Sequence, residues 1–158
     1  MLPEDAYNAK LQQTIASLEA WVGFVADVAR VSEKHDDSGW RLSLLPRSVR
    51  ACPIEIVLRP DQHYDLTIAG VTYQNRPIAS FDMFLPLVEA VAEGNVLTRR
   101  AYSSVTGLAQ GVSTVVTLAD GRVLEEVRSS EVGIAGPEGP TEMRDTHYLP
   151  YRRPNGAG

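Results

Sequence analysis

Two neighbouring segments with a strict two-residue alternation constrain the fold of this chain most. In residues 54–59 and again in residues 64–69, every second residue is a large apolar one. Side chains of a β-strand point to opposite faces in turn, so this period predicts strands buried on one face. Residues 60–63 between them contain proline and aspartate, which favour a short hairpin connection. The side chains expected on the buried face are Ile54, Ile56, Leu58, Tyr64, Leu66 and Ile68.

Further extended segments follow the same logic. Residues 40–45 precede the two alternating segments, and Gly70 is expected to mark a bulge or second turn within an extended stretch that continues to Tyr73. Later in the chain, residues 96–106, 112–118 and 122–128 read as strands, the last two joined by an Asp-Gly hairpin turn. The pattern predicts a meander of hairpin-linked strands.

Helical periodicity appears in two places. From Glu4 to Lys34, apolar residues recur at steps of three and four, which predicts one long amphipathic helix. A shorter helix is expected from Asp82, a good N-cap residue, to Glu93. The apolar stripe of the long helix consists of Tyr7, Leu11, Ile15, Leu18, Val22, Val25 and Ala29.

The order of these elements predicts an α+β fold. We expect an antiparallel meander sheet with the long N-terminal helix and the shorter central helix packed on one face, and a flexible C-terminal tail. Residues 1–130 would form a single domain, and residues 131–158 a Gly/Pro linker followed by a C-terminal arm. The arm is expected either to fray or to dock on its own domain or a neighbouring subunit.

Composition excludes several classes of protein. A chain of 158 residues with 44% hydrophobic residues can bury a core without crosslinks. Its one cysteine rules out internal disulfides, and it also rules out zinc sites built on four cysteines or on two cysteines and two histidines. The net charge of -5 argues against a nucleic-acid partner.

The richest apolar stretch, residues 20–31, is interrupted by Asp27 and Arg30, and acids lie close to the first methionine. We therefore expect a cytoplasmic protein with no signal peptide and no membrane span.

No local motif indicates catalysis or a cofactor. The histidines His35, His63 and His147 lie near acids in turns or the tail, without the helical spacing of a metal-binding pair. Ser113 lacks the surroundings of a nucleophile elbow, and Cys52 precedes an apolar strand, which favours a buried and inert thiol. We therefore expect no catalytic, metal or cofactor site and favour a non-enzymatic protein.

A second apolar stripe in the long helix supplies the leading functional hypothesis. Its width exceeds what packing on one sheet requires, so either another segment of the chain or a partner must cover it. We predict a protein-interaction or adaptor-like module that acts as a homodimer. The element order, acidic pI and size are similar to the outline of small dimeric secretion chaperones, although the long C-terminus and weak final helix signal depart from it. The residues of this stripe are Trp21, Phe24, Val28 and Val31.

The alternative is a small-molecule-binding domain or modest enzyme with a pocket between the sheet and its helices. Aromatic side chains would line this pocket, and His63 or Arg100 would lie at its entrance. For an anionic ligand, the candidates are Arg100, near Tyr102, and Arg59 on a separate strand. The expected lining residues are Tyr64, Tyr73, Phe81 and Phe84.

Overall fold

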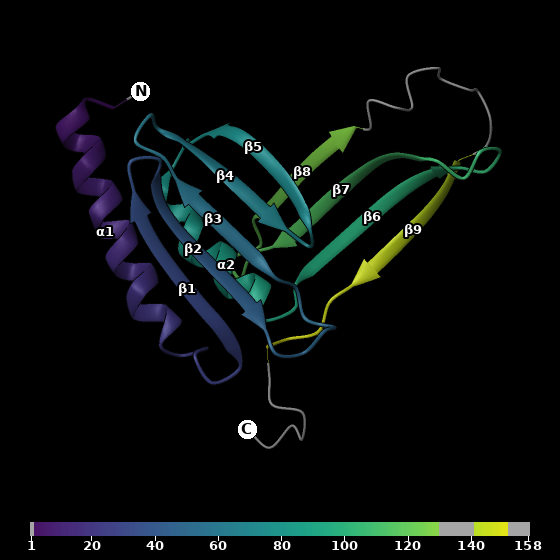
Figure 1. Ribbon diagram of the computed structural model, residues 1–158, viewed down its shortest axis with the longest axis horizontal. Helices are drawn as coiled ribbons and strands as arrows, with labels where there is room; N and C mark the ends of the chain where they lie inside the picture. The colour runs from purple at the N-terminus through teal and green to yellow at the C-terminus, as the bar shows by residue number, and fades with distance from the viewer. Residues whose placement is uncertain (1, 130–140, 152–158) are drawn as a thin grey trace.

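The computed structural model describes residues 2–129 and 141–151, which form two helices, a short 3-10 helix and two antiparallel sheets (Figure 1). The helices are α1 (Glu4–Val22), η1 (Phe81–Met83) and α2 (Phe84–Ala92). The first sheet contains β1 (Ala29–Asp36), β2 (Gly39–Pro46), β3 (Ile54–Leu58), β4 (His63–Ile68) and β5 (Val71–Pro77) in chain order. The second has the order β8-β7-β6-β9 and contains β6 (Val96–Ser103), β7 (Ala109–Thr117), β8 (Val123–Ser129) and β9 (Thr141–His147). The expected α+β class is confirmed.

The five-stranded sheet follows the alternation of its sequence. Strands β3 and β4 pair so that Ile56 lies opposite Leu66, and both side chains are about 1% exposed. Hairpins join β1 to β2 and β4 to β5, and the positive φ of Gly39 and Gly70 suits these turns. The buried face of this sheet therefore forms a continuous apolar wall.

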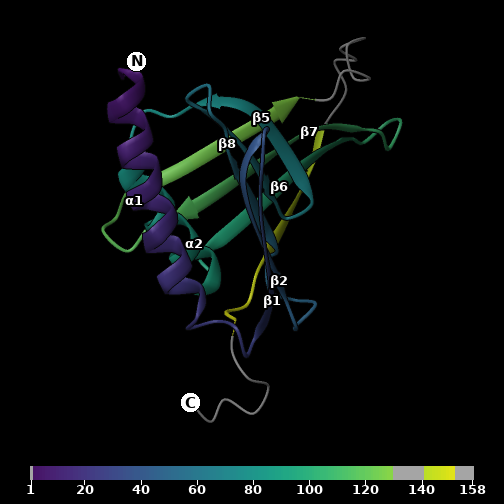
Figure 2. The ribbon, with the colours of Figure 1, turned by 60° about the vertical axis from the view of Figure 1, so that its left-hand side comes forward.

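Both helices cover the same face of the five-stranded sheet, as Figure 2 shows. Leu18 of α1 and Leu87 of α2 have no exposed surface and belong to the same core cluster as the sheet. The hydroxyl of Tyr7 donates a hydrogen bond to the backbone carbonyl of Arg59, which fixes the start of α1 against the β3–β4 hairpin. Within the described ranges, no helix is both long and apolar enough to cross a membrane.

The four-stranded sheet shares the core through its inner face. Val96 and Val116 are buried there with the hydroxyl residues Thr98 and Thr114. The hydroxyls of Tyr73 in β5 and Thr114 in β7 are hydrogen bonded at 2.9 Å, and Arg76 in β5 pairs with Glu126 in β8 at 2.7 Å. The two sheets thus meet along β5 and β8 and diverge from there (Figure 1).

The predicted long helix is wrong beyond Val22. The chain turns at residues 23–28 through short-range backbone bonds such as that from the amide of Val25 to the carbonyl of Val22, at 3.1 Å. Ala29 then starts β1, which pairs along its full length with β2. Valines at steps of three fit a helix and also a turn followed by an edge strand, and cross-strand pairing selects the second.

The C-terminal arm docks on its own domain, one of the two alternatives, as far as residue 151. Residues of β9 pair antiparallel with β6 along its length. Beyond β9, the hydroxyl of Tyr151 donates to the backbone carbonyl of Cys52, and its amide donates to the carbonyl of Ala92 at 2.7 Å. These bonds hold the arm against both the first sheet and α2. The predicted linker, residues 131–140, lies outside the described residues.

Candidate anion-binding site

The inner face of the second sheet carries a row of arginines. Arg100 in β6 lies directly opposite Arg144 in β9. On its other side, Arg100 lies opposite Val112 in β7. Val112 in turn lies opposite Arg128 in β8. Because side chains alternate along a strand, this row shares the face of Thr98 and Thr114, two residues nearer the core. The order of the strands is visible in Figure 1. We call Arg100, Arg128 and Arg144 the arginine row.

The charges of the arginine row are only partly compensated. In the described part of the chain, the side chain of Arg100 has no ion-pair or hydrogen-bond partner. Arg128 makes one long hydrogen bond, 3.5 Å, to the carbonyl of Thr72. Arg144 lies over the ring of Tyr102, 4.7 Å from its centroid, and pairs with Glu142 on its own strand at 3.2 Å. Like charges directly opposite on a sheet destabilise it, so the row favours binding of an anion.

A cavity of about 480 Å³ lies next to the row, between β5 and β8. Its wall from β5 carries the polar and aromatic side chains Tyr73, Gln74 and Arg76, and Arg128 closes it on β8. Arg76 also lies over the ring of Tyr73, 5.7 Å from its centroid. Arg128, at one end of the arginine row, therefore lines a space of the size that small-molecule sites usually have.

The Tyr73 hydroxyl, whose residue lines the cavity, lies within electrostatic range of Arg100. Burial raises the pKa of the Tyr73 hydroxyl, while its bond to Thr114 and the nearby charge of Arg100 act in the opposite direction. The net shift of the pKa is upward, so this hydroxyl stays protonated at neutral pH. The Tyr73 hydroxyl is therefore a hydrogen-bonding group held in place by Thr114 and not a base.

The spacing of the strands sets what the arginine row can hold. Neighbouring strands lie about 4.8 Å apart, so Arg100 and Arg144 start from adjacent backbones, and Arg128 starts about 10 Å from Arg100. A guanidinium binds carboxylate or phosphate oxygens in pairs through its planar N–H groups. The row suits a ligand with more than one negatively charged group, because Arg100 and Arg128 place positive charges two strands apart.

The structure brings together two of the predicted pocket residues, Tyr73 and Arg100. Tyr64 and Phe84 instead lie in the core, with their rings edge to face at 5.1 Å, and they fill the space between sheet and helix. His63 is half-buried in the β3–β4 hairpin, where its Nδ1 lies 2.9 Å from the backbone oxygen of Asp61. Phe81 packs against Tyr7 with 5.4 Å between ring centroids.

Arg59, the second predicted anion ligand, is already neutralised. Its guanidinium lies 2.6 Å from a carboxylate oxygen of Asp61 and 3.5 Å from one of Asp65. It also donates to the side-chain oxygen of Asn75 at 3.1 Å. The arginines that join Arg100 were not anticipated, because only the fold places Arg76, Arg128 and Arg144 near it.

The predicted interaction stripe does not form one helical face. Phe24 lies in the turn after α1 and is 81% exposed. Trp21, Val28 and Val31 are partly buried and pack against the core from the end of α1, the turn and β1. Part of the stripe is thus covered by the chain itself, which is the other alternative that the sequence left open.

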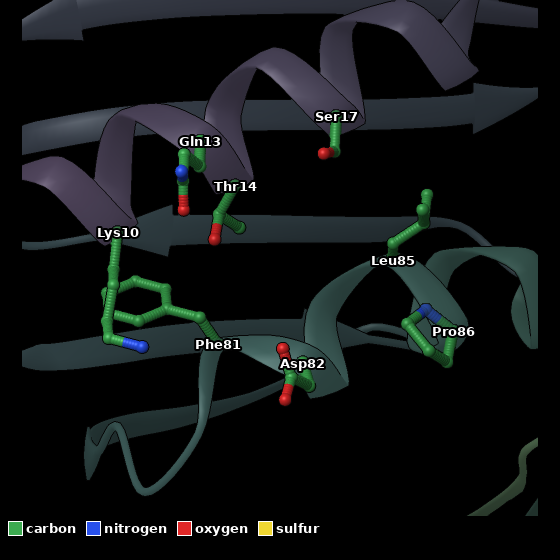
Figure 3. Close-up of a pocket in the computed structure, with 8 residues that line it drawn as sticks. All are labelled: Lys10, Gln13, Thr14, Ser17, Phe81, Asp82, Leu85 and Pro86. Atoms are coloured by element: carbon green, nitrogen blue, oxygen red, sulfur yellow. The ribbon is translucent and has the colours of Figure 1, made fainter.

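A second cavity, of about 300 Å³, lies between α1 and the start of α2 (Figure 3). From α1, polar side chains spaced three and four residues apart line it, and Asp82 and Leu85 face them. It adjoins another cavity of similar volume that shares Lys10, Phe81 and Asp82. One cation and one carboxylate in the same groove give no preference for a charged ligand. The residues from α1 are Lys10, Gln13, Thr14 and Ser17.

Cys52 is a buried thiol, as the sequence predicts. It has no exposed surface, and burial raises its pKa to about 12. At neutral pH it is therefore almost entirely protonated and a poor nucleophile. Among residues 2–129 and 141–151, no three His, Cys, Asp or Glu side chains are placed to hold a metal ion.

Comparison of the chain with protein-family models, with curated proteins and with solved structures finds no match.

Proposed function

We propose that this chain is a non-enzymatic binding protein that captures a small multivalent anion between its two sheets. The observation that carries the proposal is the direct opposition of Arg100 and Arg144, with no acidic partner for Arg100 in the described residues. A bound phosphate or carboxylate group would remove the repulsion between the two guanidinium groups and add charge-assisted hydrogen bonds.

The local charge supports the proposal because it opposes the charge of the whole chain. The chain carries a net charge of -5, yet Arg76 in the cavity wall and the inner face of the second sheet with Arg100, Arg128 and Arg144 together hold four arginines, with only Glu126 and Glu142 among the described residues. Four positive and two negative groups give this region a local charge of +2. A positive cleft on an acidic protein concentrates small anions and disfavours extended polyanions.

Isothermal titration calorimetry with inorganic phosphate, pyrophosphate, tripolyphosphate and citrate tests the proposal. We expect affinity to rise from phosphate to tripolyphosphate, because longer probes reach both ends of the arginine row. Arg100→Gln should weaken the binding of tripolyphosphate at least tenfold, which corresponds to about 1.4 kcal/mol. Arg30→Gln provides the matched control, because Arg30 is also a strand arginine but lies exposed on β1.

Two results would overturn the proposal. One is the absence of measurable heat with all four anions at millimolar concentration and low salt. The other is an equal loss of affinity in the Arg30 and Arg100 variants, which would show diffuse attraction and no site. Thermal melting of each variant checks that the fold is retained.

A further inference from the structure

The strand that supplies Arg144, β9, is the least buried strand of the second sheet. All seven of its residues are exposed, whereas β6, β7 and β8 each contain buried or half-buried residues. β9 lies at the edge of the sheet, beside β6 (Figure 1). Ordering an exposed strand costs backbone entropy, which the burial of apolar surface does not offset here. We therefore expect β9 to open locally more readily than the strands of the core.

Contacts outside the arginine row hold the two ends of the arm unequally. On the outer face of the sheet, Arg99 donates two hydrogen bonds to Asp145, of 2.8 and 2.9 Å. Beyond β9, the amide of Leu149 donates to the carbonyl of Arg50 at 2.9 Å, and Tyr151 is buried. Because these later contacts anchor the arm to the domain, β9 can open from its start without release of the whole arm.

The arginine row works against the docking of β9. Arg100 on β6 and Arg144 on β9 occupy directly opposite positions, and like charges there weaken strand pairing. The contact of Arg144 with the ring of Tyr102, 4.7 Å from its centroid, offsets part of this repulsion. The ion pair of Arg144 with Glu142 lies within β9 and does not join the two strands. An anion between the two guanidinium groups would replace the repulsion with hydrogen bonds to both strands.

We propose that the anion fastens β9 to β6, so that occupancy of the arginine row controls how firmly the C-terminal arm is docked. This inference rests on the proposed function. Arg100 and Arg128 belong to strands that stay paired when β9 opens, and Arg144 joins them only when β9 is docked. The docked chain thus offers the anion one more guanidinium group than the open chain. By linkage, the anion favours the docked state by the same factor by which docking raises the affinity for the anion.

The size of the coupling follows from the contribution of Arg144. A hydrogen bond to a charged group changes an equilibrium constant by about tenfold or more. At saturation, the anion should therefore lower the opening equilibrium of β9 about tenfold. An open β9 leaves the backbone groups along the edge of β6 unpaired, and such an edge is able to pair with another strand. The anion thus also controls whether this edge is available.

Hydrogen–deuterium exchange, followed by mass spectrometry with and without saturating tripolyphosphate, tests the coupling. We expect exchange of the backbone amides of β9 to slow about tenfold at saturation. β1 is the matched control strand, because it is also a largely exposed edge strand but belongs to the first sheet. Its exchange should not change. Calorimetry on the same solutions reports whether the anion binds.

Two adjacent arginines of β6 separate this coupling from general stabilisation. Arg100→Gln should slow exchange in β9 without anion, because it removes the repulsion, and should abolish most of the response to tripolyphosphate. Arg99→Gln is the matched control on the opposite face of the strand. It should accelerate exchange in β9, because Asp145 loses its partner, and should leave the fold-change on anion addition intact. Arg100→Met repeats the test if Arg100→Gln does not fold, and circular dichroism reports the fold.

The outcomes distinguish the coupling from the proposed function. Slower exchange in β9 alone, with opposite effects of the two substitutions, supports the coupling. Saturable heat in the calorimeter with unchanged exchange in β9 overturns the coupling and leaves the proposed function intact. Equal slowing in β1 and β9 also overturns it, because the anion would then stabilise the whole fold. The absence of heat with every anion overturns the proposed function and the coupling with it.

Discussion

The hydrogen bond between Tyr73 and Thr114 gives the sharpest test of how the two sheets are joined. Tyr73 is 1% exposed and Thr114 2% exposed, and their hydroxyl oxygens lie 2.9 Å apart. Tyr73→Phe leaves the Thr114 hydroxyl buried without this partner, and Thr114→Val does the same to Tyr73. The cost of one unsatisfied buried polar group is about 1–3 kcal/mol, so each single variant should lose that much stability.

The double variant should be less destabilised than the sum of the single ones. Replacing both hydroxyls with groups of similar shape removes the unsatisfied partner, and the interaction energy should be at least about 1 kcal/mol. The assay is urea unfolding followed by tryptophan fluorescence and by far-UV circular dichroism. In thermal melts, each kcal/mol should lower the Tm by about 2–4 °C for a chain of this size.

Additive losses would refute this reasoning, because they would show that the two hydroxyls do not interact. Single variants with wild-type stability would refute it more strongly, since both groups would then have other partners or contact water. A separate unfolding transition of the second sheet in either variant would show that the sheets do not share one cooperative core.

Local geometry and titration supply three further predictions. Gly39→Ala should cost at least about 2 kcal/mol in urea unfolding, because Gly39 has a φ of 126° and a Cβ there would clash with the backbone oxygen of Leu58. Cys52 should react with a thiol reagent only at the rate of unfolding, and rapid modification of the native protein would contradict its burial. Hydrogen bonds from Arg99 lower the pKa of Asp145 below its ordinary 3.8, so this carboxylate stabilises the fold above pH 3.8 and its contribution disappears as the pH falls through the lower folded value. Asp145→Asn should therefore reduce the loss of stability on acidification, and an unchanged pH profile of the urea midpoint would contradict the pairing.

Alternating apolar residues made most of the strands predictable. The segments around Ile56 and Leu66 form β3 and β4 with the expected buried faces, and the Asp120-Gly121 turn joins β7 to β8. Alternation specifies a buried face because each strand pairs with neighbours that share the same period. It does not specify how many sheets form, and the chain divides its strands between two.

The two strands that the sequence pattern did not predict, β1 and β9, lie at the edges of their sheets. β1 carries exposed polar residues over most of its length, and β9 is exposed throughout, so neither strand has a clear apolar period. Their structure depends on pairing with β2 and β6, which is a long-range effect for β9.

The candidate site was only partly predictable for the same reason. Arg100 and Tyr73 were recognisable as polar or aromatic residues on strands, but their neighbours depend on register between strands far apart in the chain. Arg144 joins Arg100 through β9, and Arg128 joins through β7 and β8. A period of two assigns a side chain to a face, and only the register brings charges together on that face.

The most direct test of the anion site is nuclear magnetic resonance of the arginine Nε–H groups during titration with tripolyphosphate. The account predicts saturable shifts that are largest for Arg100, Arg128 and Arg144, with Arg41, which lies in the first sheet and pairs with Glu55 at 3.2 Å, unaffected. Small shifts of similar size at all the exposed arginines, with no saturation, would contradict a binding site in the cleft.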